Sequence, residues 1–252
     1  NYLPVGLGDN IKSEKFLRDN SGTNITKKNS SYGEYTFHYW LWKNGIKNLE
    51  KEWIGFCQYR KFWSVKKLDN TLNDLNDLNN IILKEIPNNL QNFDSILGTP
   101  LYINEFKPIK FLKKDFLKIL KKPSFFFDKS KRNIHFHFDL MHGDGNLKRA
   151  INLLGEEDRI EFLNFVNSEV SFNPHNMFIC KSKKIMSNYY SSIFEWLFKC
   201  EKIFGFNLHG YSKQRIYGFL AERYLPYWFS KYSNNLIWPV IFYNLMDTTN
   251  EK

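Results

Sequence analysis

The chain has 252 residues, of which 42% are hydrophobic and 25% charged, a composition typical of globular proteins rather than disordered or fibrous ones. No stretch approaches the roughly 18 apolar residues that a membrane-spanning helix needs, which argues against an integral helical membrane protein. Aromatic residues make up 18% of the chain, so we expect large flat side chains to fill the core.

The cysteines indicate the cellular compartment, and the distribution of charge bears on whether the protein binds nucleic acid. Cys57, Cys180 and Cys200 lie far apart and fit neither a zinc site nor a disulfide framework, which favours a reducing, cytoplasmic compartment. The formal net charge of +10 is typical of nucleic-acid-binding proteins. However, residues 105–132 hold ten Lys and Arg against three acids, so one segment carries most of the excess. We therefore do not expect a nucleic-acid partner.

The first half of the chain predicts one helix and several shorter elements. Ser31 and Glu34 have the spacing of a capping box, and apolar residues follow at helical spacing as far as Ile46. A loop rich in turn-forming residues precedes this helix at 19–24. The other elements expected here are strands at 53–57 and 93–98, a surface helix or loop at 69–80, and a basic amphipathic helix at 107–122 that ends before Pro123.

The second half is expected to be mostly helical. Its predicted elements are a His- and Asp-rich segment at 135–144, two helices across 146–166, a strand at 176–180, helices at 183–204 and 212–230, and a closing apolar run at 237–242. Strands that alternate with helices predict an α/β fold. Since no repeat or linker interrupts the pattern, we expect a single domain over 1–252, with a basic helical insertion at about 105–132.

The first candidate site follows the predicted strand that ends at Cys57. Gln58, Tyr59, Arg60 and Lys61 stand at that strand end, and open α/β sheets bind ligands beyond the carboxyl ends of their strands. An aromatic ring and two cations suit a phosphorylated substrate. The alternative is an ordinary solvated strand end.

The second candidate site is the segment that holds His135, His137, Asp139, His142 and Asp144. Five titratable groups within ten residues could supply a general base or bind a divalent metal such as Mn²⁺ or Mg²⁺. For a metal, Asp139, His142 and Asp144 are the candidates, although their spacing matches no established metal motif.

Two further candidates lie in the last third of the chain. His175 and Asn176 enter a strand at a position suited to hydrogen bonding a sugar or ribose hydroxyl, although a lone His there can be structural. Arg215 and Glu222 share one helix face with Gly218, and Arg223 follows. The alternative for this helix is an internal salt bridge between Glu222 and an arginine.

The basic helix at 107–122 and the absent motifs also bear on function. Its lysines could attract an anionic membrane surface, or it could be an ordinary surface helix. No Gly-x-Gly-x-x-Gly, P-loop or Gly-x-Ser-x-Gly pattern occurs, which argues against Rossmann dehydrogenases, P-loop kinases and serine hydrolases.

Several segments together resemble one known family. They are Leu17–Ile25, Glu34–Asn44, Ile54–Phe62, Asn176–Ile179, Glu195–Phe198 and Arg215–Arg223. In this order they resemble a bacterial family of capsular, exopolysaccharide and O-antigen glycosyltransferases that was long known only as a domain of unknown function.

The resemblance implies a GT-A-like fold with a mixed, mostly parallel sheet, flanking helices and a helical C-terminal part. It implies a nucleotide-sugar donor, with galactose in pyranose or furanose form as the expected sugar, and a glycan or lipid-linked acceptor in surface polysaccharide synthesis. Family members carry a His where this chain has Gln58, and many GT-A enzymes bind a metal through Asp-x-Asp at this strand end. In this chain Arg60 and Lys61 stand in place of that Asp-x-Asp motif. The family's first strand would precede the segment that begins at Tyr2.

The chemistry of glycosyl transfer suggests roles for the candidate residues. Arg60 and Lys61, assisted by Arg215 or Arg223, are expected to stabilise the leaving diphosphate. Asp139, and after it Asp144, is the expected base for the acceptor hydroxyl. The expected donor-binding residues are Asp19, Asn20, Thr23, Asn24, Gln58, Tyr59, His175, Asn176, Arg215, Glu222 and Arg223. The rival functions are a non-catalytic module that binds anionic membranes or nucleic acid, and a polysaccharide-binding protein.

Overall fold

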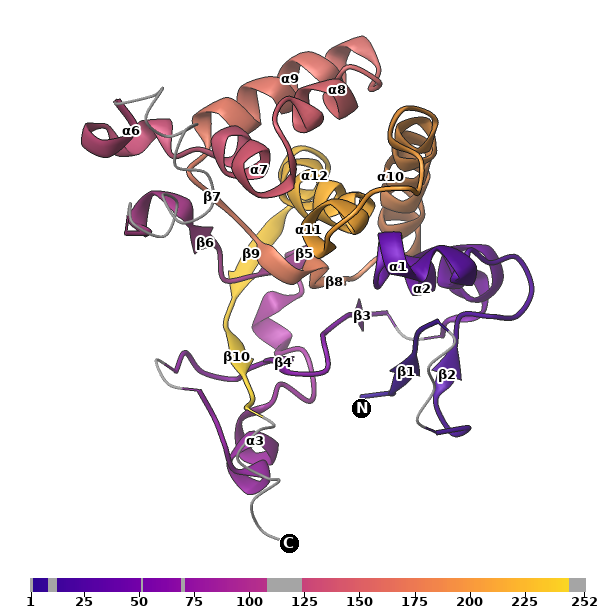
Figure 1. The fold of residues 1–252 in the computed structure, drawn as a ribbon. Helices are drawn as coiled ribbons and strands as arrows, with labels where there is room; N and C mark the ends of the chain where they lie inside the picture. Colours follow the sequence, from indigo (N-terminus) through magenta and orange to yellow (C-terminus); the bar gives the residue numbers. More distant parts are fainter. Residues whose placement is uncertain (1, 9–12, 51, 69–70, 108–123, 245–252) are drawn as a thin grey trace, which may run out of the picture.

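The structure is a computed structural model that describes residues 2–8, 13–50, 52–68, 71–107 and 124–244. Figure 1 shows the longer helices gathered on one side of a small central sheet, with the N-terminal strand pair at one flank. Most of the predicted basic helix at 107–122 falls outside the described residues.

The N-terminal half is built from short elements. Its strands and helices are β1 (Val5–Gly6), β2 (Leu17–Arg18), α1 (Asn29–Tyr32), α2 (Tyr35–Trp40), β3 (Ile54–Gly55), β4 (Lys61–Trp63), α3 (Leu75–Ile81), β5 (Ser95–Gly98) and β6 (Leu101–Tyr102). A π-helical turn over Leu41–Gly45 and a 3-10 turn over Ile46–Asn48 continue α2.

The predicted helix from Ser31 to Ile46 is interrupted near its start. Gly33 adopts a φ of 59°, a left-handed value that ends α1. The expected capping box is wrong, because Ser31 lies inside α1 and the Glu34 side chain caps no backbone N–H. Glu34 is therefore available for contacts elsewhere.

The C-terminal half carries the long helices. Its elements are α6 (Ser124–Phe127), α7 (Ile134–His142), α8 (Asn146–Ile151), α9 (Glu156–Ser168), β7 (Ser171–Phe172), β8 (Phe178–Cys180), α10 (Lys183–Phe204), α11 (Tyr211–Gln214), α12 (Ile216–Tyr232), β9 (Asn235–Trp238) and β10 (Val240–Phe242). The predicted helix at 183–204 is confirmed, while the one at 212–230 divides into α11 and α12 at Arg215.

The central sheet has the strand order β3-β8-β5-β9. Strand β8 runs antiparallel to both β3 and β5, and β5 runs parallel to β9. The α/β class and the mixed sheet are confirmed. The expectation of mostly parallel pairing does not hold for this sheet, because the inner strand β8 runs against both of its neighbours.

The closing apolar run joins two sheets. Strand β9 pairs with β5, and after Pro239 the chain continues as β10, which pairs with β4 in a separate two-stranded sheet. The indole of Trp238 donates to the carbonyl oxygen of Ser64 at 2.7 Å, which ties the bend to the chain after β4. This run therefore holds β4, and the residues that precede it, against the central sheet.

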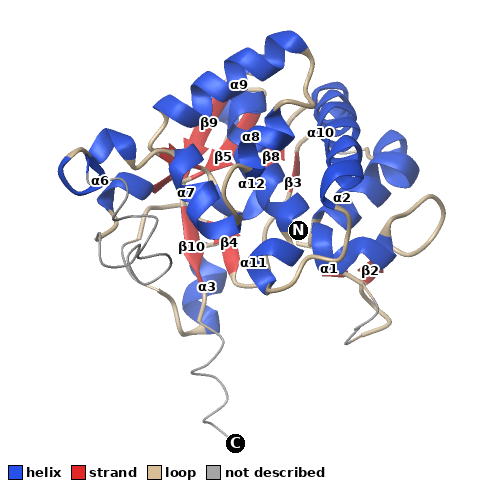
Figure 2. Cartoon of the chain, turned by 45° about the horizontal axis from the view of Figure 1, so that its top comes forward, coloured by secondary structure: helices blue, strands red, loops and turns tan. Residues whose placement is uncertain are grey.

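The core is aromatic, as the composition predicts. Helices α10 and α12 pack together and cover the sheet (Figure 2), and Phe178 of β8 contacts Tyr189 and Phe229 with ring centroids 5.5 and 5.1 Å apart. The hydroxyl groups of Tyr35 and Tyr189 bond to each other, and Tyr190 bonds to His38 at 2.8 Å. Pairing these buried polar atoms avoids the cost of leaving them without partners. In the described part of the chain no helix has the length and apolar character needed to cross a membrane.

Candidate functional site

One group of polar and charged side chains gathers where β4, the turn before β8 and the start of α12 meet α2. We call it the polar cluster, and its members are Glu34, Gln58, Lys61, His175, Asn176, Arg215, Glu222 and Arg223. Seven of these residues were predicted as site residues, in three separate segments of the sequence. The fold brings these seven together and adds Glu34.

A strained turn at Pro174–Asn176 forms the centre of the polar cluster. His175 and Asn176 have φ values of 76° and 54°, a left-handed conformation that is uncommon outside glycine. The backbone N–H of His175 donates to Glu222 Oε1 at 2.5 Å, and Asn176 Nδ2 donates to Glu34 Oε1 at 2.8 Å and to the carbonyl oxygen of Gly218 at 3.2 Å. Two carboxylates and a helix backbone thus hold this turn in place.

Glu34 lies on the other side of that turn. The preceding Gly33 makes room for Arg215, because a Cβ at Gly33 would collide with the Arg215 guanidinium. The Glu34 carboxylate lies 3.4 Å from Arg215 and also accepts from Gln58 Nε2 at 3.4 Å. Its side chain is 26% exposed. Desolvation raises the pKa of Glu34, and the Asn176 hydrogen bond and the Arg215 charge only partly oppose it.

Lys61 contributes the cation closest to the turn. Its Nζ lies 3.0 Å from Nδ1 of His175 and donates to it, so the neutral imidazole carries its proton on Nε2. Desolvation lowers the pKa of Lys61. Desolvation, followed by the Lys61 charge, lowers the pKa of His175 to about 4. His175 is therefore neutral near pH 7.

A cavity of about 190 Å³ opens beside Lys61 and His175. It extends past Gly98, the last residue of β5, and Phe242 of β10 forms part of its wall. The cavity therefore lies beyond a strand end, the place where open α/β sheets bind ligands. Next to Lys61, the Arg60 guanidinium lies over the rings of Tyr59 and Phe242, at 4.8 and 5.4 Å from their centroids, and Tyr59 is 71% exposed.

Arg223 links the polar cluster to α7 through its contacts with Glu222 and His137. It is buried, donates to the Glu222 carboxylate, and its Nη2 lies 3.3 Å from Nδ1 of His137 on α7. Its guanidinium also packs on Phe172, 3.7 Å from the ring centroid. Desolvation, together with the Arg223 charge, holds the pKa of His137 well below its ordinary value. The internal salt bridge considered for this helix is thus present, and it fixes Glu222 against the turn.

The predicted base and metal residues lie away from the polar cluster. Asp139 pairs with His135 on the face of α7 opposite His137. His142 bonds through Nδ1 to the carbonyl oxygen of Ser212 at 2.9 Å and stacks on Phe219, while Asp144 stands in the turn between Gly143 and Gly145. Within the described residues, no three His, Cys, Asp or Glu side chains come close enough to form a metal site, so Asp139, His142 and Asp144 do not make one.

The predicted nucleotide loop follows β2. Asp19 is fully buried, its backbone oxygen accepts from the Thr26 hydroxyl, and its carboxylate oxygens have no hydrogen-bond partner among the described residues. Thr23 is held by Asn44, whose Oδ1 accepts from its N–H at 3.0 Å, while Asn24 Nδ2 donates to the carbonyl oxygen of Gly22. Asn20 is exposed. A buried carboxylate without a partner is costly, so Asp19 has the character of a group that binds a ligand.

Comparison with known proteins gives a family and a fold. The model of the family described as a domain of unknown function (DUF4422) matches residues 1–234. The solved apo structure of WbbM, a bifunctional glycosyltransferase, is similar with a TM-score of 0.66 and 19% sequence identity. The match covers 91% of this chain but only 39% of the WbbM chain. No curated protein matches. The chain therefore belongs to the DUF4422 family, and its fold is similar to that of a bifunctional glycosyltransferase over about two fifths of that protein.

Proposed function

We propose that the protein is a glycosyltransferase that moves a sugar from a nucleotide-diphosphate donor to a glycan or lipid-linked acceptor in surface polysaccharide synthesis. The polar cluster carries the proposal: three cations and two carboxylates surround one strained turn beside a strand-end cavity. The fold similarity to a glycosyltransferase supports it. The three free cysteines are consistent with our proposal of a cytoplasmic reaction.

Departure of a nucleoside diphosphate requires stabilisation of its negative charge. In the proposed reaction the positive charge of Lys61, in the cavity wall, stabilises the diphosphate, and Arg60 assists from the adjacent position. Arg215, which pairs with Glu34, is the second assisting cation in this proposal, whereas buried Arg223 positions Glu222. Gln58, His175 and Asn176 bind the donor sugar, and the loop with Asp19, Asn20, Thr23 and Asn24 binds the nucleotide, with Tyr59 available to stack on the base.

The acceptor hydroxyl needs a base if the reaction inverts the anomeric configuration. We propose Glu34, since it lies in the polar cluster, remains partly exposed and has a pKa raised by burial. The sequence predicted Asp139, with Asp144 next, and Asp139 remains the competing candidate. A pKa closer to the working pH makes a carboxylate a better proton acceptor.

The proposal is tested by direct transfer and by substitution. The purified chain is assayed with sugar nucleotides, galactose donors among them, and binding of nucleoside diphosphates is followed by thermal shift. We expect Lys61→Met and Arg60→Ala to lower kcat by about 100-fold or more, since each removes a charge from the leaving group. Lys66→Met, an exposed lysine after the same strand, is the matched control and should leave kcat unchanged.

The base is assigned by comparing two isosteric variants. Glu34→Gln should abolish transfer while nucleotide binding persists, and Asp139→Asn should retain chemistry at saturating acceptor. The reverse result would make Asp139 the base. If the wild type binds no nucleotide and transfers no sugar, the glycosyltransferase proposal fails.

We also propose reversible attachment to an anionic membrane through the lysine-rich segment 107–122, which lies largely outside the described residues. Each lysine near such a surface can contribute about 1 kcal/mol of attraction. The protein should sediment with anionic liposomes at low salt, and Lys113, Lys114, Lys121 and Lys122 changed to Glu should release it. A wild type that ignores these vesicles would contradict the proposal.

A further inference from the structure

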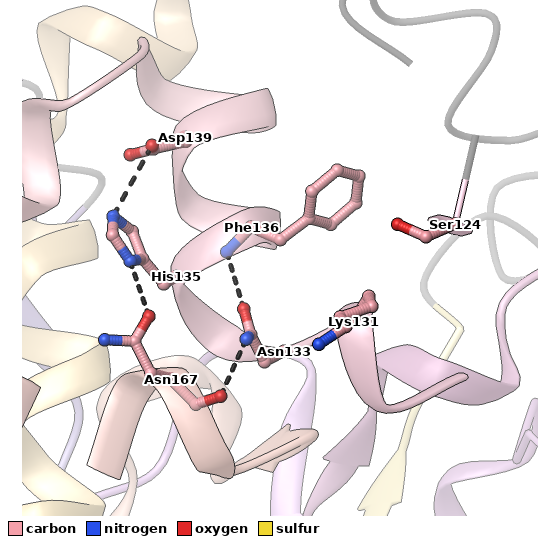
Figure 3. A pocket seen from close by; sticks show the side chains of 7 residues that line it. All are labelled: Ser124, Lys131, Asn133, His135, Phe136, Asp139 and Asn167. Carbon is pink, nitrogen blue, oxygen red and sulfur yellow. Dashed lines mark hydrogen bonds and ion pairs between the residues drawn. The ribbon is translucent and has the colours of Figure 1, made fainter. Parts of the chain in front are cut away.

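A second cavity, of about 200 Å³, lies between α7, α9 and the segment from Ser124 to Lys131. Figure 3 shows a chain of polar side chains along one side of the start of α7, while Phe136 and Ser124 stand on the other. The proposed transfer reaction uses nothing from this cavity except the competing base Asp139. Its wall combines a carboxylate, an imidazole, amides, a hydroxyl and an ammonium group with one aromatic ring.

The polar groups of this wall are fixed by bonds to the two helices. Asn133 caps α7 by accepting from the Phe136 N–H at 2.9 Å, and its Nδ2 donates to the carbonyl oxygen of Asn167 at 2.7 Å. Asn167 Nδ2 donates to the carbonyl oxygen of Leu163 at 2.8 Å, which directs Asn167 Oδ1 toward Nδ1 of His135, 2.8 Å away. Since Oδ1 can only accept, Nδ1 of His135 carries a proton.

This assignment determines what the cavity offers to a ligand. Nε2 of His135 lies 3.5 Å from the Asp139 carboxylate and pairs with it, so the two side chains hold each other in the cavity wall. A carboxylate oxygen that takes part in such a pair has a further lone pair that can accept from a ligand hydroxyl group. Lys131 and Ser124 supply donors for ligand oxygens, and Phe136 offers an apolar surface. Fixed acceptors, complementary donors and one ring suit a sugar, whereas the Asp139 carboxylate disfavours a phosphate group.

Helix α7 relates this cavity to the polar cluster. His137 faces Arg223, while His135 and Asp139, each two residues away, lie about 200° around the helix. The cavity is thus separated from the proposed site of transfer by one helix. A sugar bound there would be a unit of an extended glycan rather than the one that reacts.

We infer that the cavity lined by Ser124, Lys131, His135, Phe136, Asp139 and Asn167 is a carbohydrate-binding subsite that holds a distal sugar of the glycan acceptor. Its role as an acceptor subsite rests on the proposed glycosyltransferase function, whereas its binding of sugar does not.

Binding is tested without any transfer. Saturation-transfer NMR is recorded with methyl glycosides of galactose, glucose, mannose, rhamnose and N-acetylglucosamine as probes. At least one should receive saturation from the wild type. The double variant His135→Ala/Asn167→Ala should bind that probe about tenfold more weakly or worse, because it removes two hydrogen-bonding groups. Asn164→Ala, an exposed asparagine on the same helix, is the matched control and should bind as the wild type does.

Two further variants separate the possible outcomes. Ser124→Trp places an indole in the cavity wall without removing the bonds between α7 and α9, so it should block binding even if the double variant does not fold. Glu222→Gln, in the polar cluster, should leave probe binding intact, which excludes the donor site as the source of the signal. No saturation of any probe by the wild type, or a signal that survives Ser124→Trp, would overturn the inference. A wild type that binds a probe but transfers no sugar from any donor would instead contradict the proposed function.

Discussion

At the residue scale, two carboxylates on either side of one turn control the site. Glu222 accepts from the backbone of His175 and from Arg223, while Glu34 accepts from Asn176 and Arg215. Each carboxylate is thus held by at least one cation and one neutral donor. The strained φ values of His175 and Asn176 are maintained by these bonds, since local preference alone would not select them.

His175 provides a test of this arrangement through pH. Its pKa is lowered to about 4 in the folded protein against about 6.5 unfolded, so the unfolded chain binds more protons between these values. Stability should therefore fall as pH falls from about 6.5 to about 4. In the His175→Asn variant, asparagine tolerates the left-handed backbone. Over this pH window the free energy of unfolding of the variant should fall by about 2 kcal/mol less than that of the wild type. Urea unfolding of both proteins at several pH values measures the difference.

If the free energy of unfolding changes equally with pH in the wild type and the variant, His175 is not held in a desolvated neutral form. His38, whose pKa is also lowered by desolvation, to about 3, contributes equally to both proteins and cancels in the comparison.

The residues of the polar cluster show what the sequence could and could not predict. Lys61, Arg215 and Glu222 were predicted because strand ends and helix faces are visible as local patterns. Glu34 was missed, since its spacing from Ser31 indicated a capping box, and only the left-handed turn at Gly33 frees its side chain. Asp139 was predicted as the base from local density of titratable groups, a signal that cannot tell which face of α7 a side chain occupies.

At the scale of elements, the close packing of α12 against α1 builds the site. Gly218 lies in α12 where a Cβ would stand 3.2 Å from the carbonyl oxygen of Tyr32, and its own carbonyl accepts from Asn176. This close approach explains why a glycine stands in the middle of α12. Helix propensity alone would favour alanine there by about 1 kcal/mol.

We expect Gly218→Val to lower the free energy of unfolding by about 2–3 kcal/mol, because the larger side chain forces α12 away from α1. Donor binding should weaken as well, since Asn176 loses its position. Chemical denaturation and nucleotide titration provide the two measurements. Ser230→Val, at an exposed position of the same helix, controls for the cost of a β-branched residue. Equal losses in the two variants would contradict the packing argument.

Helices were predicted most accurately where the hydrophobic repeat extends over many residues. Helix α10 was predicted with its correct bounds because its apolar residues repeat over six turns between a Ser182 cap and Gly205. Strands were predicted less accurately. Both β3 and β8 were predicted as buried strands, but only β8 is buried, and their antiparallel pairing depends on contacts distant in sequence.

At the scale of the whole molecule, the site draws on segments from residue 34 to residue 223, so it exists only in the folded chain. Arg60 and Lys61 lie between the end of β3 and the start of β4, where the resemblance to GT-A enzymes would place a metal-binding carboxylate motif, and α12 with its N-cap supplies Arg215 and Arg223. The charge needed to stabilise a diphosphate is therefore available from side chains.

We accordingly expect sugar transfer to persist after chelation. Activity in EDTA should remain within a few fold of the untreated enzyme, measured by release of the nucleoside diphosphate. Complete loss in EDTA that Mn²⁺ restores would contradict this expectation and show that the segment from His135 to Asp144, or another site, holds a metal ion.

The course of β9 and β10 has a practical consequence for where this domain ends. The family match stops at residue 234, one residue before β9 begins. A protein shortened at that residue would lose one of the two strands that pair with β5 and the strand that pairs with β4. Exposed strand edges favour association between chains. We expect the shortened protein to aggregate, visible as a rise in light scattering on expression and purification, whereas a chain ending at residue 244 stays monodisperse. The boundary suggested by the family match thus cuts through two sheets, and the useful limit of the domain lies at least ten residues further on.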